Sequence, residues 1–295
     1  MTKKPRTRSN PGRFSDALTE DRYGRPFARA NRRKIRREFV NWLRKKHKPD
    51  RASLRLAKKL ARCKASQRCR SLACPQCAYA VQNVVTAVAT AFVKAQPDAT
   101  RLVAVSVVPA DGTTQPGNLS IDQHQRNIRR WKERLGKAGV TWFIGATDWS
   151  FNEHAQDRYV PHWSEHFYGI TTTDDPEALK RSLQKQFSKT DAIPRPVKIK
   201  PWDRDEQALR YMLKTDFFRR IGTDNGQRAK KNSPEKRKCR ATDKQPLRSR
   251  EKRELLVHLD QIGIQGRLIL KWLQIVHQGK GQWILADRRP QSVGT

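Results

Sequence analysis

The stretch Val160-Pro161-His162-Trp163-Ser164-Glu165-His166-Phe167-Tyr168-Gly169 lies at the centre of the pattern that decides the fold. Its aromatic and β-branched content predicts a β-strand. Alternate positions of a strand share a face, so one face is expected to carry His162, Ser164, His166 and Tyr168. Two imidazoles on one strand face can hold a divalent metal ion. Taken alone, however, two histidines in an aromatic strand are more often polar residues at the rim of a sheet.

Outward from this stretch, strands and helices alternate in a recognisable order. The predicted strands are Arg101–Val108, Val140–Phe151, Tyr159–Thr172 and Arg195–Trp202. The predicted helices are Ser120–Lys137, Asp174–Phe187 and Asp205–Arg220. The order strand, helix, strand, strand, helix, strand is that of the split βαβ in ferredoxin-like folds. We therefore expect an α+β fold, with an antiparallel sheet and helices on one face.

The flanking regions divide the chain further. We expect a flexible basic arm over residues 1–30 and a region of basic helices with a cysteine knuckle over 31–97. Pro49-Asp50 breaks the basic helices, and residues 78–95 form an apolar helix. The α+β domain spans 98–222, a basic loop spans 223–250, and a C-terminal helical extension spans 251–295. That extension contains helical segments at Leu255–Leu259 and Leu268–Val276 and a strand-like run at Trp283–Leu285.

The charge balance indicates an acidic polymer as partner. The 295 residues include 63 Lys and Arg against 28 Asp and Glu, a formal net charge of +35. Nucleic acid is the first candidate for such a field, although charge alone does not select an enzyme over a packing protein. No apolar segment of bilayer-spanning length and no apolar signal-peptide core is evident, so we expect no membrane association and a cytoplasmic location.

Four cysteines within fifteen residues form a second constellation. Cys63, Cys69, Cys74 and Cys77 offer four thiolates, and Cys74-Pro75-Gln76-Cys77 is a common zinc half-site. In a reducing compartment we interpret the cluster as a structural Zn²⁺ site, with free buried thiols as the alternative. Cys239 stands apart from it.

A third constellation is Tyr211-Met212-Leu213-Lys214, which places a phenol and an amine three residues apart. On a helix such residues are neighbours. A free phenol has a pKa of about 10, so its attack on phosphorus needs a metal ion or a cation such as Lys214. The alternative is an aromatic residue that packs against the fold with its hydroxyl exposed.

Together these features resemble the His-hydrophobic-His (HUH) superfamily of rolling-circle replication initiators, which includes plasmid Rep proteins and related transposases. The resemblance covers about residues 60–222. In that superfamily a Pro-His-x-His strand binds the metal and a Tyr-x-x-Lys helix carries the nucleophile, which Tyr211 to Lys214 matches. For the first motif, either His162 and His166 pair across an enlarged gap, or His166-Phe167-Tyr168 is the motif with Tyr168 replacing a histidine.

The resemblance implies a metal-dependent tyrosine DNA endonuclease. Mg²⁺ or Mn²⁺ would be held by His162, His166 and Asp148, while Tyr211 attacks single-stranded origin DNA and Lys214 steadies the phosphate. A 5′-phosphotyrosine link and a free 3′-hydroxyl would result. Host helicase and polymerase are expected partners, because the chain has no Walker loop. Basic residues expected to contact DNA are Arg32, Arg33, Lys34, Arg36, Arg37, Lys45 and Arg210.

Two readings therefore follow from the sequence. The first is a nicking and joining enzyme that starts rolling-circle replication of a plasmid or phage-like element, or a transposase of the same superfamily. The second is a non-catalytic, zinc-containing nucleic-acid-binding protein.

Overall fold

The computed structural model describes residues 26–44, 49–97, 100–190, 193–230, 233–278 and 283–288. The predicted arm over residues 1–30 lies outside the described residues, apart from its last five positions. The N-terminal region contains the helices α1 (Pro26–Arg44), α2 (Arg51–Ala61) and α3 (Pro75–Lys94). Asp50 begins α2, because its carboxylate accepts a hydrogen bond from the Ser53 amide at 2.7 Å. Pro75 occupies the first turn of α3, where a missing N–H costs nothing.

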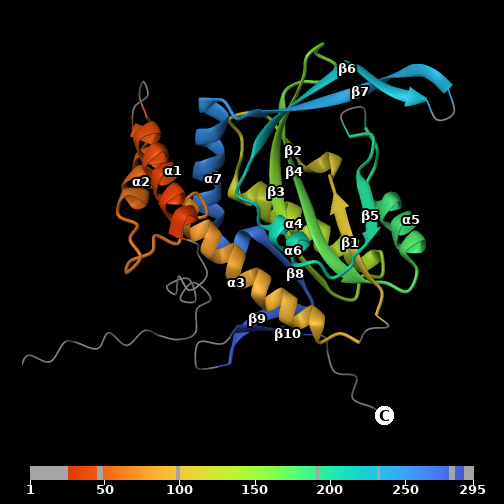
Figure 1. Ribbon diagram of the computed structural model, residues 1–295, viewed down its shortest axis with the longest axis horizontal. Helices are drawn as coiled ribbons and strands as arrows, with labels where there is room; N and C mark the ends of the chain where they lie inside the picture. Colours follow the sequence, from red (N-terminus) through yellow and green to blue (C-terminus); the bar gives the residue numbers. More distant parts are fainter. Residues whose placement is uncertain are drawn as a thin grey trace, which may run out of the picture.

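A mixed sheet forms the centre of the molecule (Figure 1). Its strands are β1 (Leu102–Val107), β2 (Thr113–Thr114), β3 (Phe143–His154), β4 (His162–Thr172), β5 (Val197–Pro201), β6 (Phe218–Lys230), β7 (Ser233–Pro246) and β8 (Leu268–Lys271). The order along the main path is β5-β1-β4-β3-β6-β7, with β2 on β4 and β8 on β3. From β5 to β3 all neighbours are antiparallel, whereas β6 pairs parallel to β3. The sheet is therefore mixed, whereas the sequence predicts an antiparallel sheet.

Helices cover both faces of this sheet. On one face α4 (Ile121–Lys137) and α5 (Pro176–Gln186) pack through Trp131, Leu135 and Leu183 against the odd-numbered valines of β1. On the other face the short helix α6 (Glu206–Met212) buries Leu209 and Met212 beside residues of β3 and β4. The prediction of helices on one face is therefore correct only for α4 and α5.

Three local predictions for the C-terminal half were wrong. The helix predicted over Asp205–Arg220 ends at Met212, because residues from Phe218 onward pair with β3 and β7 instead. The predicted basic loop over 223–250 is largely the ribbon of β6 and β7. Helix α7 (Ser249–Arg267) is present, but Leu268–Val276 forms β8 and then β9 (Leu273–His277). Strand β10 (Trp283–Asp287) pairs with β9, in agreement with the strand-like run that the sequence shows there.

One apolar cluster links these regions. It runs from Val40 of α1 through the sheet to Leu285 of β10, across the boundaries drawn from the sequence. Helix α3 is long and apolar enough to cross a membrane, contrary to the expectation that no segment is, but most of its apolar window is buried in the fold. It packs against α6 and β10, as a core helix does.

Candidate active-site face and cysteine cluster

The register of β3 against β4 gathers the predicted polar residues on one face of the sheet. Asp148 lies directly opposite His166, Ser150 opposite Ser164, and Asn152 opposite His162. The pleat gives these pairs the same orientation, as the sequence parity predicts. Helix α6 lies over this face, since the Tyr211 and Tyr168 ring centroids are 5.5 Å apart.

Asp148 is the electrostatic centre of this face. Its side chain is almost fully buried and forms an ion pair with the Lys214 ammonium. The same carboxylate lies 3.7 Å from His166 Nε2. Asp148 Oδ1 and His166 Nε2 have no hydrogen-bond partner among the described residues. Two neighbouring side chains thus each have one buried, ligand-type atom without a hydrogen-bond partner in the described part of the chain, which calls for an explanation in a native fold.

His166 is a neutral imidazole at physiological pH. Burial lowers its pKa to about 4, and the charges of Arg220 and Lys214 act in the same direction, while Asp148 opposes them. A neutral ring keeps a nitrogen lone pair for a metal ion or a proton.

Tyr211 stands at the exposed edge of this group. Tyr211 is 53% exposed at the end of α6, which places it among the exposed large hydrophobic residues of the described chain. The Lys214 ammonium lies 5.0 Å from the centre of the Tyr211 ring. Lys214 follows the end of α6 rather than lying in it, but its amide still donates to the Tyr211 carbonyl at 3.2 Å. Tyr211 and Lys214 are therefore neighbours, as predicted, although the helix ends at Met212.

His162 does not join this group. It lies four residues from His166 on the same strand face, which separates them by about 13 Å. Its ring packs against Tyr159, with centroids 5.4 Å apart, and its Nδ1 contacts the Val160 carbonyl. The structure therefore does not bring together the expected three ligands His162, His166 and Asp148.

Two arginines at this face were not predicted from the sequence. Arg267 is buried, and its guanidinium donates to the carbonyls of Thr147 and Lys214, which fixes the segment after α6 to β3. Burial lowers its pKa to about 10, while Asp148 opposes the shift. Arg220 acts on His166 by its charge. Neither lies in a motif, so no signal in the sequence could have selected them.

The four predicted cysteines converge at the junction of α2 and α3. Sγ of Cys63 lies 3.7 Å from those of Cys74 and Cys77, and Sγ of Cys69 lies 3.6 Å from that of Cys77. Four thiolates at about 2.3 Å from a tetrahedral zinc ion would stand about 3.8 Å apart. Disulfide sulfurs would be only about 2.05 Å apart. The cluster therefore has the geometry of a metal site, and it is the only such group of His, Cys, Asp or Glu among the described residues.

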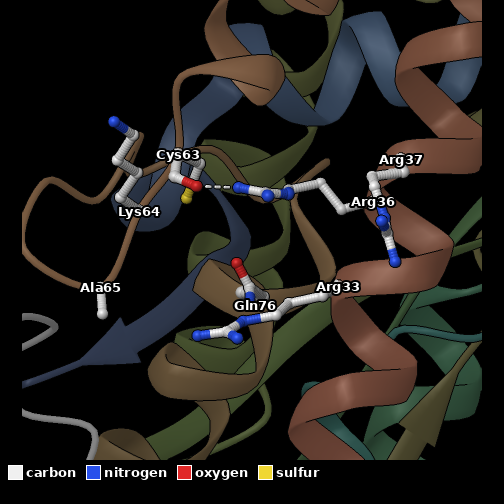
Figure 2. A pocket seen from close by; sticks show the side chains of 7 residues that line it. All are labelled: Arg33, Arg36, Arg37, Cys63, Lys64, Ala65 and Gln76. Carbon is white, nitrogen blue, oxygen red and sulfur yellow. Dashed lines mark hydrogen bonds between the residues drawn. The ribbon is translucent and has the colours of Figure 1, made fainter.

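The basic helix α1 borders the cysteine cluster (Figure 2). A pocket of about 360 Å³ is lined by Arg33, Arg36, Arg37, Cys63, Lys64, Ala65 and Gln76. The Arg36 guanidinium donates to the Cys63 carbonyl and so ties α1 to the knuckle. Arg33, Lys34 and Arg37 are exposed, as DNA contacts require.

The remaining predicted DNA contacts have other surroundings. The guanidinium of Arg32 lies 3.7 Å above the Tyr79 ring, and Arg210 bonds to Glu206 and Asn83. Lys45 lies outside the described residues. Trp42 of α1 faces the fold, because its indole N–H donates to the Ser249 hydroxyl of α7 at 3.3 Å.

Comparison of the chain with protein-family models, with curated proteins and with solved structures gave no match. The molecule is thus placed by its own features, as a strongly basic mixed α/β protein with a four-cysteine cluster of metal-binding geometry.

Proposed function

We propose that this protein nicks and rejoins single-stranded DNA through Tyr211 and so starts rolling-circle replication of a plasmid or phage-like element. The observation that carries the proposal is the exposed Tyr211 phenol beside Lys214, over the buried Asp148 and His166. A nucleophile that must reach a polymer needs exposure, and its activating charge needs a fixed position.

The sheet supports this assignment. The order β5-β1-β4-β3 with antiparallel neighbours is compatible with the split βαβ arrangement that the sequence predicts and that the resemblance to the HUH superfamily implies. His166 and Asp148 lie on β4 and β3, the two middle strands of the main path, under the helix that bears the tyrosine.

The chemistry balances as a phosphoryl transfer. Tyr211 gives up its proton to solvent water, and its oxygen forms a bond to the scissile phosphorus. The bond from phosphorus to the 3′-oxygen breaks, and that oxygen leaves as a hydroxyl after taking a proton. Lys214 lowers the cost of the negative charge on the phenolate and phosphate. Rejoining is the reverse transfer, to the 3′-hydroxyl.

A divalent ion fits this face in part. His166 Nε2 and Asp148 Oδ1 are buried and have no hydrogen-bond partner among the residues that the structure describes, and Mg²⁺ or Mn²⁺ often takes one or two protein ligands with water and phosphate oxygens. When bound there, the ion would polarise the scissile phosphate. Zn²⁺ in turn fits the cluster of Cys63, Cys69, Cys74 and Cys77, where we assign it a structural role.

Covalent capture tests the proposal. A pool of random single-stranded oligonucleotides with a 3′ fluorophore is incubated with the protein and Mn²⁺, because the tyrosine keeps the downstream fragment. We expect a fluorescent adduct on a denaturing gel, absent in Tyr211→Phe and retained in Tyr79→Phe. Tyr79 is the control, because it is a tyrosine of α3 that does not belong to the group of Asp148, His166, Tyr168 and Lys214. An adduct that persists in Tyr211→Phe contradicts the assignment of the nucleophile.

Two observations favour the second function, a non-catalytic nucleic-acid-binding protein. The Lys214 ammonium already neutralises Asp148, and His162 does not contribute to the same site. DNA binding without an adduct, with Mn²⁺ or Mg²⁺ alike, would establish that function instead.

A further inference from the structure

Two pockets border the cysteine cluster, one beside α1 and one beside α2. The pocket beside α1 has a volume of about 360 Å³ and includes Cys63 in its wall (Figure 2). The pocket beside α2 has a volume of about 310 Å³ and includes Cys69 in its wall. The Cys63 and Cys69 sulfurs lie within 4.8 Å of each other, so one cluster joins the walls of both pockets.

Both pockets are lined by cations and, among the described residues, by no acidic side chain. The pocket beside α1 takes its charge from Arg33, Arg36, Arg37 and Lys64. The cations that line the pocket beside α2 are Arg55, Lys58, Lys59, Arg62 and Arg68. Cations that are gathered in this way repel one another and attract an anionic partner.

The cations of each helix recur at the spacing of a single helix face. On α1 they occupy positions 33, 36 and 37, and on α2 and its C-terminal cap they occupy positions 55, 58, 59 and 62. Residues three or four apart are neighbours on a helix, and like charges at such positions destabilise it. Helix stability therefore does not explain either row, which indicates a role in binding.

Few of these cations are neutralised within the protein. Lys59 pairs with Asp260 at 2.6 Å, and the Arg36 guanidinium donates to a neutral group, the Cys63 carbonyl. No ion pair with a described residue is formed by Arg33, Arg37, Arg55, Lys58, Arg62 or Lys64. A zinc ion held by four thiolates carries two surplus negative charges. The cations outnumber these charges, so most of them remain available to a further anion.

The phosphate backbone of duplex DNA is the anion that suits these pockets. Duplex DNA carries one negative charge per about 1.7 Å of its axis, about twice the density of a single strand. Sites for a single strand usually add aromatic side chains on which the bases stack. Among the described residues, no Phe, Tyr or Trp lines either pocket. The pockets therefore offer contacts to phosphates and none to stacked bases.

We propose that α1, α2 and the cysteine cluster form a phosphate clamp, which grips the backbone of duplex DNA with both pockets. The clamp does not rest on the proposed function, because it needs neither Tyr211 nor an ion beside Asp148. A metal ion in the cluster would hold the two pockets at a fixed separation, since Cys63 and Cys69 would share it.

Charge-removing variants of exposed residues test the clamp, in a Tyr211→Phe background that prevents cleavage. Arg37→Gln/Lys64→Gln removes two cations from the pocket beside α1, and Arg55→Gln/Lys58→Gln removes two from the pocket beside α2. Lys198→Gln/Lys200→Gln is the matched control, because both lysines are exposed on β5, at the opposite end of the molecule from α1 and α2 (Figure 1). Binding of a labelled mixed-sequence 30-base-pair duplex is followed by fluorescence anisotropy between 50 and 200 mM salt.

We expect each pocket variant to weaken duplex binding roughly tenfold at 50 mM salt and to lower the salt slope by about 1.8, at about 0.9 for each lost phosphate contact. The combined four-residue variant should lower the slope by about 3.6, because both pockets hold one duplex. The control should change the affinity less than twofold. Equal losses in the control and the pocket variants, no loss in the pocket variants, or a combined variant no weaker than either of them would overturn the proposal. A larger loss for a 30-nucleotide oligo-dT than for the duplex would overturn it as well.

Metal analysis separates the clamp from a role of these cations in the cysteine site. We expect both pocket variants to keep the metal content and the Tm of the parent protein. Loss of metal together with loss of duplex binding would show that the cations serve the cysteine site, and would overturn the clamp. Duplex binding that depends on the pockets, in a protein that forms no tyrosine adduct, would reject the nicking function and leave the clamp intact.

Discussion

At the scale of single residues, His258 shows how burial without partners turns into a dependence on pH. Its ring is 2% exposed, and neither nitrogen has a hydrogen-bond partner among the described residues. Burial lowers its pKa to about 3, and the neighbouring charge of His124 acts in the same direction. His124 itself has a raised pKa, because Glu165 accepts from its ring and outweighs the effect of burial.

We predict that His258 destabilises the fold as the pH falls. Below pH 6.5 His258 is protonated in the unfolded chain, but in the folded chain it stays neutral until about pH 3. The free energy of unfolding therefore decreases as the pH falls from 6.5 to about 3. At pH 5 the loss is about 2 kcal/mol. Urea unfolding at pH 7 and pH 5 should show a smaller drop for His258→Leu than for the wild type. An identical drop in both proteins would show that His258 titrates normally.

His166 is the internal comparison for this measurement. Its pKa is also lowered, to about 4, so it contributes a loss over a similar range. His258→Leu should therefore remove only part of the pH dependence, and His258→Leu/His166→Leu should remove more. The raised pKa of His124 has the opposite sign: its contribution is present at low pH and is lost as the pH rises through its folded pKa.

At the scale of elements, the pairing of β3 with β4 depends on two glycines. Gly145 lies directly opposite Gly169, and the Phe143 ring lies over both. A Cβ on Gly145 would stand 2.7 Å from the Tyr168 carbonyl and 2.8 Å from Phe143 Cζ. A Cβ on Gly169 would overlap the same ring and stand 2.7 Å from Gly145 Cα. Either Cβ would therefore force β3 and β4 apart, and these are the strands that carry Asp148 and His166.

Gly169→Ala should therefore destabilise the protein by about 2 kcal/mol or more, because it overpacks a tight site. Gly136→Ala is the matched control: it lies in α4, exposed, where its Cβ would meet only the flexible side chain of Lys271. Alanine there should be neutral or should stabilise by about 0.5–1 kcal/mol. Chemical denaturation measures both, and equal effects in the two variants would contradict the packing argument.

At the scale of the whole molecule, the cysteine cluster fastens the N-terminal helices to the core. It closes the junction of α2 and α3, α2 pairs with α7 through Lys59 and Asp260 at 2.6 Å, and α3 packs on α6. We expect one Zn²⁺ per chain, and metal binding of this kind contributes directly to folding.

Removal of this metal should lower the thermal midpoint. Cys74→Ser is expected to lose most of the bound zinc and on the order of 10 °C in Tm, measured by metal analysis and by calorimetry. Cys239→Ser is the control, because it lies in β7, away from the cluster. Full stability after complete zinc removal would show that the four thiols hold the junction without metal.

The sequence by itself determined the elements whose signals are local. Strand parity placed Asp148 and His166 on one face, the spacing of Tyr211 and Lys214 made them neighbours, and four close cysteines predicted their own cluster. Each of these depends on a period or on a short separation along the chain, which local geometry fixes.

Only the tertiary structure decided the rest. Residues 218–246 have a polar, basic composition typical of a loop, but the free edge of β3 offers them backbone hydrogen bonds, and they form β6 and β7. Arg267 and Arg220 reach the candidate active-site face from elements that no motif marks. His162 shares the parity of His166, and yet four residues of extended strand keep it away from Asp148. Pairing across long separations depends on which edges and faces remain unfilled, and that is a property of the assembled sheet.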